Sequence, residues 1–138
     1  MIILDTNVIT EVLRDGGQQI PWFRIQDPDT LHISVTTLCE VTYGLDRMPA
    51  GKHREFTWKK WLALEPVLRA VALPVNSTIA DMAGVILARR ESAGRRIELA
   101  DAQIAATAVV HHATIATRNV KDFEDLGLTL VNPWEWQP

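Results

Sequence analysis

The sequence predicts an α/β fold, a mainly parallel sheet of about five strands covered by helices on both faces. Short apolar segments alternate along the chain with longer segments of helical periodicity, which is typical of strand–helix–strand units. The short segments are apolar throughout rather than alternating, as expected of strands that are buried on both faces. We expect these strands at residues 2–4, 31–35, 70–75, 114–117 and 128–132.

Helices are predicted between the strands from apolar faces that repeat every three or four residues. Their ends follow from capping and breaking residues: Gly16-Gly17 after the first helix, Asn76 or Ser77 before a later one, and Gly94 after it. We expect helices at residues 6–14, 18–26, 36–45, 52–69, 76–92 and 99–112, with a turn or short helix at 119–125.

Length and composition indicate one domain, residues 1–138, in a reducing compartment such as the cytoplasm. A chain of 138 residues can bury a core without covalent cross-links. Its one cysteine, Cys39, cannot form an internal disulfide, and we expect it to be a small core residue. We see neither a signal peptide nor an apolar run of about 18 residues that could span a membrane. The net charge of −3 neither indicates nor excludes nucleic-acid binding.

Acidic residues follow the predicted strands, at the edge where parallel α/β sheets place their functional sites. Asp5 directly follows the first strand, and Glu40 lies in the early turns of the helix after the second. Asp101 lies in the first turn of the apolar helix that precedes the fourth strand, and Asn119 and Asp122 come just after that strand. We therefore expect these groups to converge.

Most of these acids also have a purely structural interpretation. Asp5 could cap the helix that follows it. Thr37 and Glu40 have the spacing of a capping box, and Asp122 could favour a helix dipole from its first turn. Asp101 has no such explanation, because its neighbours on the helix face are small and apolar and no Lys or Arg stands three or four residues away.

Converging carboxylates require a counter-charge. Two of them about 4 Å apart repel by roughly 4 kcal/mol at an effective dielectric near 20, which is large against a total stability of about 5–15 kcal/mol. Oxygen ligands alone favour Mg²⁺ or Mn²⁺. Such an ion indicates phosphate chemistry, in which a metal-activated water attacks a phosphodiester.

Other common sites lack their signatures in this chain. There is no G-x-G-x-x-G, P-loop or G-x-S-x-G segment, which argues against dinucleotide, P-loop and hydrolase sites. The histidines show no zinc-binding spacing, and His111 and His112 are expected at a helix C-terminus.

Four segments resemble the PIN-domain ribonucleases, above all the VapC-type toxins and their FitB-like and plasmid-stability branch: MIILDTNVITEVLR, SVTTLCEVTYGL, LADAQIAATAVVHHATIATRNVKDFEDLGL and VNPW. The likeness covers essentially the whole chain in order. It implies an α/β/α sandwich around a parallel sheet and Mg²⁺- or Mn²⁺-dependent RNA cleavage, with Asp5, Glu40 and Asp101 holding the metal. It also implies a homodimer, and a cognate antitoxin, often DNA-binding, that joins the toxin in larger assemblies.

The chain departs from this family at the fourth acidic position. FitB-like members can carry an aspartate directly after the A-T-R run, where this chain has Asn119, and the next acid is Asp122. The resemblance leaves open which of the two approaches the metal. It places Thr6 and Thr117 where they can hydrogen-bond the acids. Two further acids nearby are expected to be solvated: Asp81 and Glu98.

An acidic site needs a positive rim if RNA is to approach it. The candidates are Arg14, Arg95, Arg96 and Arg118, with Lys52, Arg54, Lys59 and Lys60 along the long basic helix. Trp58 and Trp61 could stack on bases, but we expect them to pack against the core or a partner.

Two rival functions are retained. One is another Mg²⁺-dependent α/β phosphatase or phosphoryl-transfer domain, against which Asn7 counts because the D-x-D motif of such phosphatases needs an acid there. The other is a catalytically degenerate module that only binds an antitoxin, for which Asn119 is the one hint.

Overall fold

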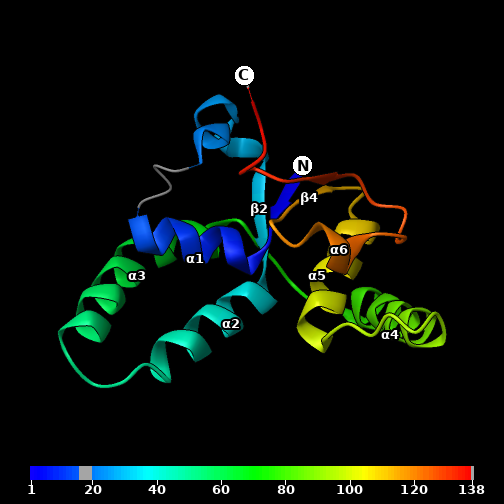
Figure 1. Cartoon of the computed structure of the whole chain (residues 1–138), viewed down its shortest axis with the longest axis horizontal. Helices are drawn as coiled ribbons and strands as arrows, with labels where there is room; N and C mark the ends of the chain where they lie inside the picture. Colours follow the sequence, from blue (N-terminus) through cyan, green and yellow to red (C-terminus); the bar gives the residue numbers. More distant parts are fainter. Residues whose placement is uncertain (16–19, 138) are drawn as a thin grey trace.

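The computed structural model of the chain describes residues 1–15 and 20–137 (Figure 1). Within these residues five strands form one sheet in the order β3-β2-β1-β4-β5, and every neighbouring pair is parallel. The predicted parallel sheet is confirmed, with shorter strands than expected. Their bounds are β1 Ile2–Leu4, β2 Leu31–Ser34, β3 Ala72–Leu73, β4 Thr114–Ala116 and β5 Leu130–Val131.

The helices lie close to their predicted positions, and none in the described part of the chain is long and apolar enough to cross a membrane. Asn76 caps α4 through its side chain, which accepts from the Ile79 amide at 3.0 Å. His111 ends α5, and His112 has a φ of 51°, so both histidines stand at the helix C-terminus as expected. The bounds are α1 Thr6–Asp15, α2 Val35–Asp46, α3 Lys52–Ala70, α4 Ser77–Ser92, α5 Leu99–Val110 and α6 Val120–Phe123.

The short helix predicted over residues 18–26, with Pro21 near its first turn, is present over its described part as a 3-10 helix. Pro21–Ile25 forms a 3-10 helix, and Pro28–Thr30 forms a second one that the sequence did not predict. Asp27 is extended, as the residue before a proline usually is, so the chain cannot continue as one α-helix. The predicted break at Gly16-Gly17 lies outside the described residues.

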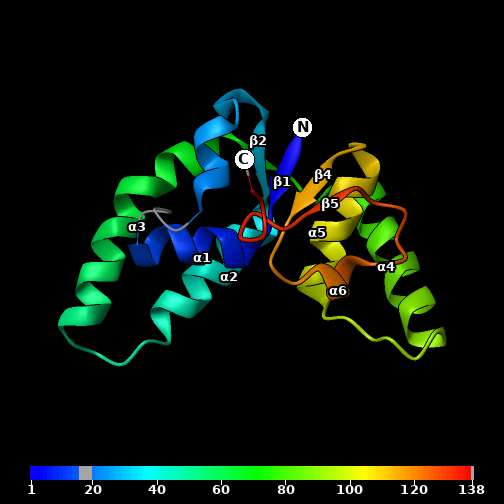
Figure 2. The same ribbon diagram turned by 45° about the horizontal axis from the view of Figure 1, so that its top comes forward.

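Two cores, one on each face of the sheet, make the fold an α/β/α sandwich. Along β1, Ile3 packs with α4, α5 and α6, whereas the next residue, Leu4, packs with α1, α2 and α3. Ile115 and Ala116 alternate in the same way along β4. Figures 1 and 2 show the two helical layers on opposite sides of the strands.

Cys39 is exposed, so its predicted place in the core is wrong. The buried stripe of α2 consists of Thr37, Val41 and Leu45, which leaves Cys39 on the outer face of the helix. Trp61 is buried and Trp58 is partly buried against the same core, which confirms that both pack rather than project from α3.

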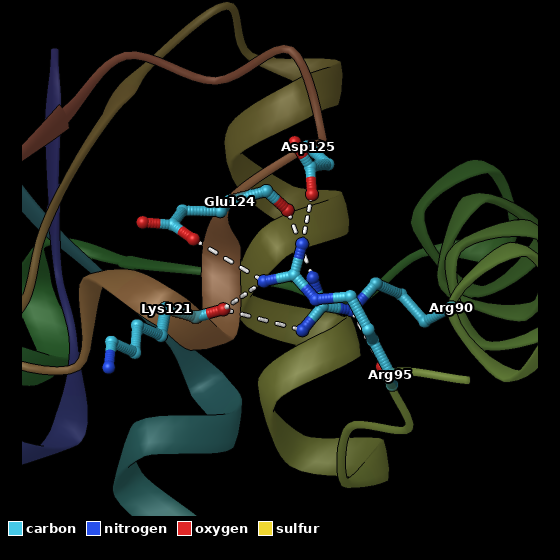
Figure 3. Close-up of polar contacts among 5 residues, drawn as sticks. All are labelled: Arg90, Arg95, Lys121, Glu124 and Asp125. Atoms are coloured by element: carbon cyan, nitrogen blue, oxygen red, sulfur yellow. Dashed lines mark hydrogen bonds and ion pairs between the residues drawn. The ribbon is translucent and has the colours of Figure 1, made fainter. Parts of the chain in front are cut away.

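A buried arginine attaches α6 to α4. Arg90 is 5% exposed, and its guanidinium donates to the carbonyls of Arg95 at 2.9 Å, Glu124 at 3.0 Å and Lys121 at 3.4 Å (Figure 3). Arg95, a predicted RNA-rim residue, pairs with Glu124 at 3.3 Å and with Asp125. These contacts hold the turn after α6, and with it the position of the whole short helix.

Replacing Arg90 with methionine should lower the free energy of unfolding by about 2–4 kcal/mol, because three carbonyls lose a charged donor whose own side chain is buried. Arg89→Met, at the exposed neighbouring position, is the matched control and should change stability little. Urea unfolding measures both. Equal stability of the two variants would contradict this account.

Candidate active site

The site lies where the strand order reverses. From β1 the chain runs to β2 and β3 on one side, and then returns to β4 and β5 on the other. The carboxyl ends of β1 and β4 therefore flank the point where open α/β sheets bind their ligands. Asp5 directly follows β1, and Thr117 directly follows β4.

Asp5 is 4% exposed, and three donors hold its carboxylate. The Thr6 amide, the Asn7 side-chain amide and the Thr117 hydroxyl each donate to it at 2.7 Å. The backbone carbonyl of Asp5 accepts the first bond of α1, from the Val8 amide at 3.0 Å. Asp5 thus occupies the position of a cap residue before α1, but its side chain also bonds Thr117, directly after β4.

Glu40 is directed toward α1 rather than toward its own helix end. The Thr6 hydroxyl donates to its carboxylate at 2.5 Å. Ser34, not Thr37, caps α2 by accepting from the Thr36 amide at 3.2 Å. The capping-box interpretation of Thr37 and Glu40 is therefore wrong, because the helix begins earlier than expected.

Asp101, in the first turn of α5, is partly buried and has no hydrogen-bond donor among the described residues. Burial raises the pKa of its carboxyl group to about 7, and the charges of Asp5, Glu40 and Asp122, followed by Glu98, add to that rise. The pKa of Asp5 is also raised, first by burial and then by Glu40 and Asp122, although the hydrogen bonds from Thr117 and Thr6 oppose this.

Asn119 and Asp122, the two predicted site residues that follow β4, differ in their relation to the pocket. Asn119 is exposed and lines the acidic pocket, and its amide donates to the Thr117 hydroxyl at 2.9 Å. Asp122, in the first turn of α6, is not part of that lining, yet its charge raises the pKa values of both Asp5 and Asp101. Both residues therefore belong to the surroundings of the site, in different ways.

Asn7 and Glu11 were missed as site residues. Besides bonding Asp5, the Asn7 amide donates to the Thr117 hydroxyl at 3.2 Å, and its oxygen accepts from the Arg118 backbone amide at 3.3 Å. Glu11 is 5% exposed and pairs with Arg14. Both residues line the pocket. Their signal in the sequence is a polar stripe at helical spacing along α1, opposite its apolar face.

The eight residues predicted to form the basic rim fall into three groups: two line the pocket, three are exposed outside its lining, and three bond within the fold. Arg14 and Arg118 line the acidic pocket, whereas Arg96, Lys52 and Lys59 are exposed outside its lining.

The other rim candidates bond within the fold. Lys60 donates to the carbonyls of Leu13 at 2.9 Å and Arg14 at 3.0 Å, and Arg54 pairs with Asp46 at 3.1 Å. Arg95 forms ion pairs with Glu124 and Asp125, the acids that follow α6. Of the predicted rim, the fold thus brings only two arginines to the pocket.

The pocket measures about 370 Å³. Among residues 1–15 and 20–137, no three His, Cys, Asp or Glu side chains are gathered tightly enough to enclose an ion by themselves. The donor set nevertheless fits Mg²⁺ or Mn²⁺: it consists of oxygens, and Mg²⁺ usually keeps several waters and takes only one or two carboxylates together with substrate phosphates. Four carboxylates line the pocket: Asp5, Glu11, Glu40 and Asp101. Glu11 is paired with Arg14, which leaves the other three for a cation.

The sequence also matches a known protein family. The PIN domain matches residues 2–127 of the chain. This chain belongs to the PIN-domain family. It is 37% identical over 138 residues to the VapC ribonuclease Y4jK of Sinorhizobium fredii, a match that covers 98% of this PIN-domain chain and 99% of that relative. It is 30% identical over 137 residues to toxin FitB of Neisseria gonorrhoeae, with coverage of 97% and 99%.

A solved structure of FitAB bound to the IR36 DNA fragment superposes on the PIN-domain chain with a TM-score of 0.86 at 29% identity, covering 100% of this chain and 99% of that one. The resemblance to VapC- and FitB-type toxins drawn from the sequence is confirmed.

Asp101→Asn should stabilise the chelator-treated protein at about pH 8 by roughly 1–2 kcal/mol, allowing for solvent screening. The folded protein keeps a proton on Asp101 up to a pKa of about 7, whereas the unfolded chain releases it near 4. The stability that this proton confers is therefore complete below about pH 4 and is lost as the pH rises through 7.

Near pH 4 the two proteins should be equally stable in urea unfolding. Asp81→Asn, on the exposed face of α4, is the control and should show no such pH dependence. A difference between Asp101→Asn and wild type that stays constant with pH would contradict the assignment.

Proposed function

We propose that this PIN-domain chain is a divalent-metal-dependent endoribonuclease and the toxin of a type II toxin–antitoxin pair. One observation carries the proposal: carboxylates from both helical layers face one pocket at the reversal point of the sheet. Burial first, and then the charges of the neighbouring carboxylates, raise the pKa values of Asp5 and Asp101. A cation would relieve that repulsion. The kinship with VapC- and FitB-type proteins supports RNA as the substrate.

Asp5, Glu40 and Asp101 would hold the ion, Mg²⁺ or Mn²⁺. When bound, it would supply an activated water and stabilise the charge that develops on the phosphate and the leaving oxygen. Asp101 is suited to direct contact, because no described residue donates to its oxygens. Asp5 and Glu40 have their orientation fixed by donors on α1 and after β4.

The hydroxyls of Thr6 and Thr117 have a positioning role in this proposal. Each donates to one carboxylate, Thr6 to Glu40 and Thr117 to Asp5, and so sets the direction of its free lone pairs. Asn119 would orient a water at the pocket wall, and Asp122 would add negative charge from outside. This division follows from their positions, one lining the pocket and the other set back from it.

A protein antitoxin is the proposed partner. An apolar groove of about 370 Å³ lies between α1, α2 and α3, and Leu13, Val41, Leu45 and Met48 contribute to its walls. The groove adjoins the acidic pocket, since both have Glu40 in their lining. A partner segment seated there would also cover the carboxylates. The similarity to FitAB bound to DNA supports a DNA-binding antitoxin, and we further propose a homodimeric toxin within such an assembly.

The two rival functions find less support. A D-x-D phosphatase needs an acid at position 7, but the Asn7 amide there is occupied by Asp5 and Thr117. A degenerate binding module would not need to retain mutually repelling carboxylates, and the charge of Asp122 partly compensates for Asn119.

Purified chain, freed of any partner, should cleave structured bacterial RNA with Mg²⁺ or Mn²⁺ and lose that activity in EDTA. Asp5→Asn and Asp101→Asn should each lower the rate at least a hundredfold, because each removes a charge that would hold the ion. Gel analysis of RNA fragments measures this, with Asp81→Asn as the active control. Cleavage that persists in EDTA would sink the proposal, and release of phosphate from small monoesters without RNA cleavage would favour the phosphatase.

Thr117→Val should weaken Mg²⁺ binding about 10- to 100-fold while preserving the shape of the side chain, because Asp5 loses its donor from β4. The matched control is Thr114→Val, at the first residue of β4, the strand that Thr117 follows. Titration of RNA cleavage against Mg²⁺ concentration separates the two. An unchanged Mg²⁺ requirement in Thr117→Val would remove Thr117 from the positioning role.

A further inference from the structure

Two cationic side chains line the acidic pocket, and they differ in how their charge is used. The buried carboxylate of Glu11 pairs with Arg14 and offsets its charge. Arg118, in contrast, is exposed and forms no ion pair with any described residue. Of the two, Arg118 is therefore the one that offers an uncompensated positive charge at the mouth of the pocket.

Both the backbone amide and the guanidinium of Arg118 contact neighbouring residues. Its backbone amide donates to the side-chain oxygen of Asn7 at 3.3 Å, and Asn7 in turn bonds the carboxylate of Asp5 at 2.7 Å. The guanidinium carbon lies 5.1 Å from the centroid of the Trp134 ring, within the range of a cation–π contact. An arginine stacked in this way keeps its hydrogen-bonding edge free.

Trp134 is itself fixed in place. Its backbone amide donates to the side-chain oxygen of Asn132 at 3.1 Å, and Pro133 between them is buried. The Trp134 ring is partly buried against the core on the α1–α3 side. The Thr117 amide bonds the carbonyl of Val131 at 2.9 Å, so this C-terminal turn is joined to β4 directly before Arg118. The turn lies beyond residues 2–127, the part of the chain that the PIN domain matches.

We propose that Arg118 and Trp134 form a phosphate-binding element for the RNA backbone at the mouth of the acidic pocket. This inference rests on the proposed ribonuclease function. The pocket carboxylates repel a polyanion, so a strand that enters needs a cation at the rim. The guanidinium of Arg118 donates to phosphate oxygens, and the Trp134 ring restricts the guanidinium so that less conformational entropy is lost on binding.

In the test, RNA cleavage kinetics are measured for Arg118→Ala, Arg118→Lys, Trp134→Leu and Trp134→Phe. Arg118→Ala should lower kcat/KM about tenfold, mainly through KM. Trp134→Leu should lower kcat/KM about threefold, again through KM, because the guanidinium of Arg118 keeps its charge but is no longer restricted by an aromatic ring. Trp134→Phe restores an aromatic face and should lie close to wild type, whereas Arg118→Lys should fall between Arg118→Ala and wild type.

A second measurement does not depend on turnover. In the Asp101→Asn background, binding of a short fluorescein-labelled single-stranded RNA is followed by anisotropy over a range of salt concentrations. Arg118→Ala should reduce the slope of log Kd against log salt by about 1, the signature of one lost phosphate contact. The matched control is Arg47→Ala, since Arg47 is also exposed and lies 5.4 Å from the ring centroid of Tyr43, outside the pocket lining.

Each outcome decides the inference. If wild type cleaves RNA but Arg118→Ala matches Arg47→Ala in KM and salt slope, the phosphate-binding element is wrong while the ribonuclease function stands. If Trp134→Phe is as impaired as Trp134→Leu, the role of the aromatic face is wrong. If wild type cleaves no RNA, the proposed function fails and the inference falls with it.

Discussion

The hydrogen bond between the Thr117 hydroxyl and the buried carboxylate of Asp5 joins residues 112 positions apart in the chain. It exists because β1 and β4 pair in parallel, so that both residues follow their strands at the same edge of the sheet. Asn7 reinforces the contact from α1, and it also binds the backbone of Arg118. The first acid, its donors and the rim arginine are thus fixed by one pair of neighbouring strands.

The acids of the site come from both helical layers. Asp5 and Glu40 belong to the α1–α2 side, and Asp101 and Asp122 to the α5–α6 side, with the sheet edge between them. A hydrogen bond of 3.0 Å from Thr36 on α2 to Gln103 on α5 links the layers beside the pocket.

The electrostatic cost of this arrangement falls chiefly on Asp101. It sits in the first turn of a helix, where the dipole favours its charge, yet burial and four neighbouring carboxylates raise its pKa to about 7. Asp5 is more deeply buried but has three donors. The site therefore combines one carboxylate that the fold fully satisfies with one that the fold leaves unsatisfied. In the proposed function, a cation would complement the carboxylate that the fold leaves unsatisfied.

The sequence by itself determined the parallel α/β sheet, the packing of Trp58 and Trp61, and the strand-end acids, because apolar runs and helical periodicity are local properties of the chain. It misplaced Cys39, which lies about half a helical turn from the buried Thr37 and Val41 and is therefore on the outer face of α2. The alternative interpretation of Thr37 and Glu40 as a capping box is wrong, because Ser34 caps α2 and Thr37 lies inside the helix. Only the tertiary structure decided which cations remain free. Arg95 and Lys60 are bound within the fold, whereas Arg118 meets Trp134 through the pairing of β4 and β5, a contact between distant residues that no local pattern encodes.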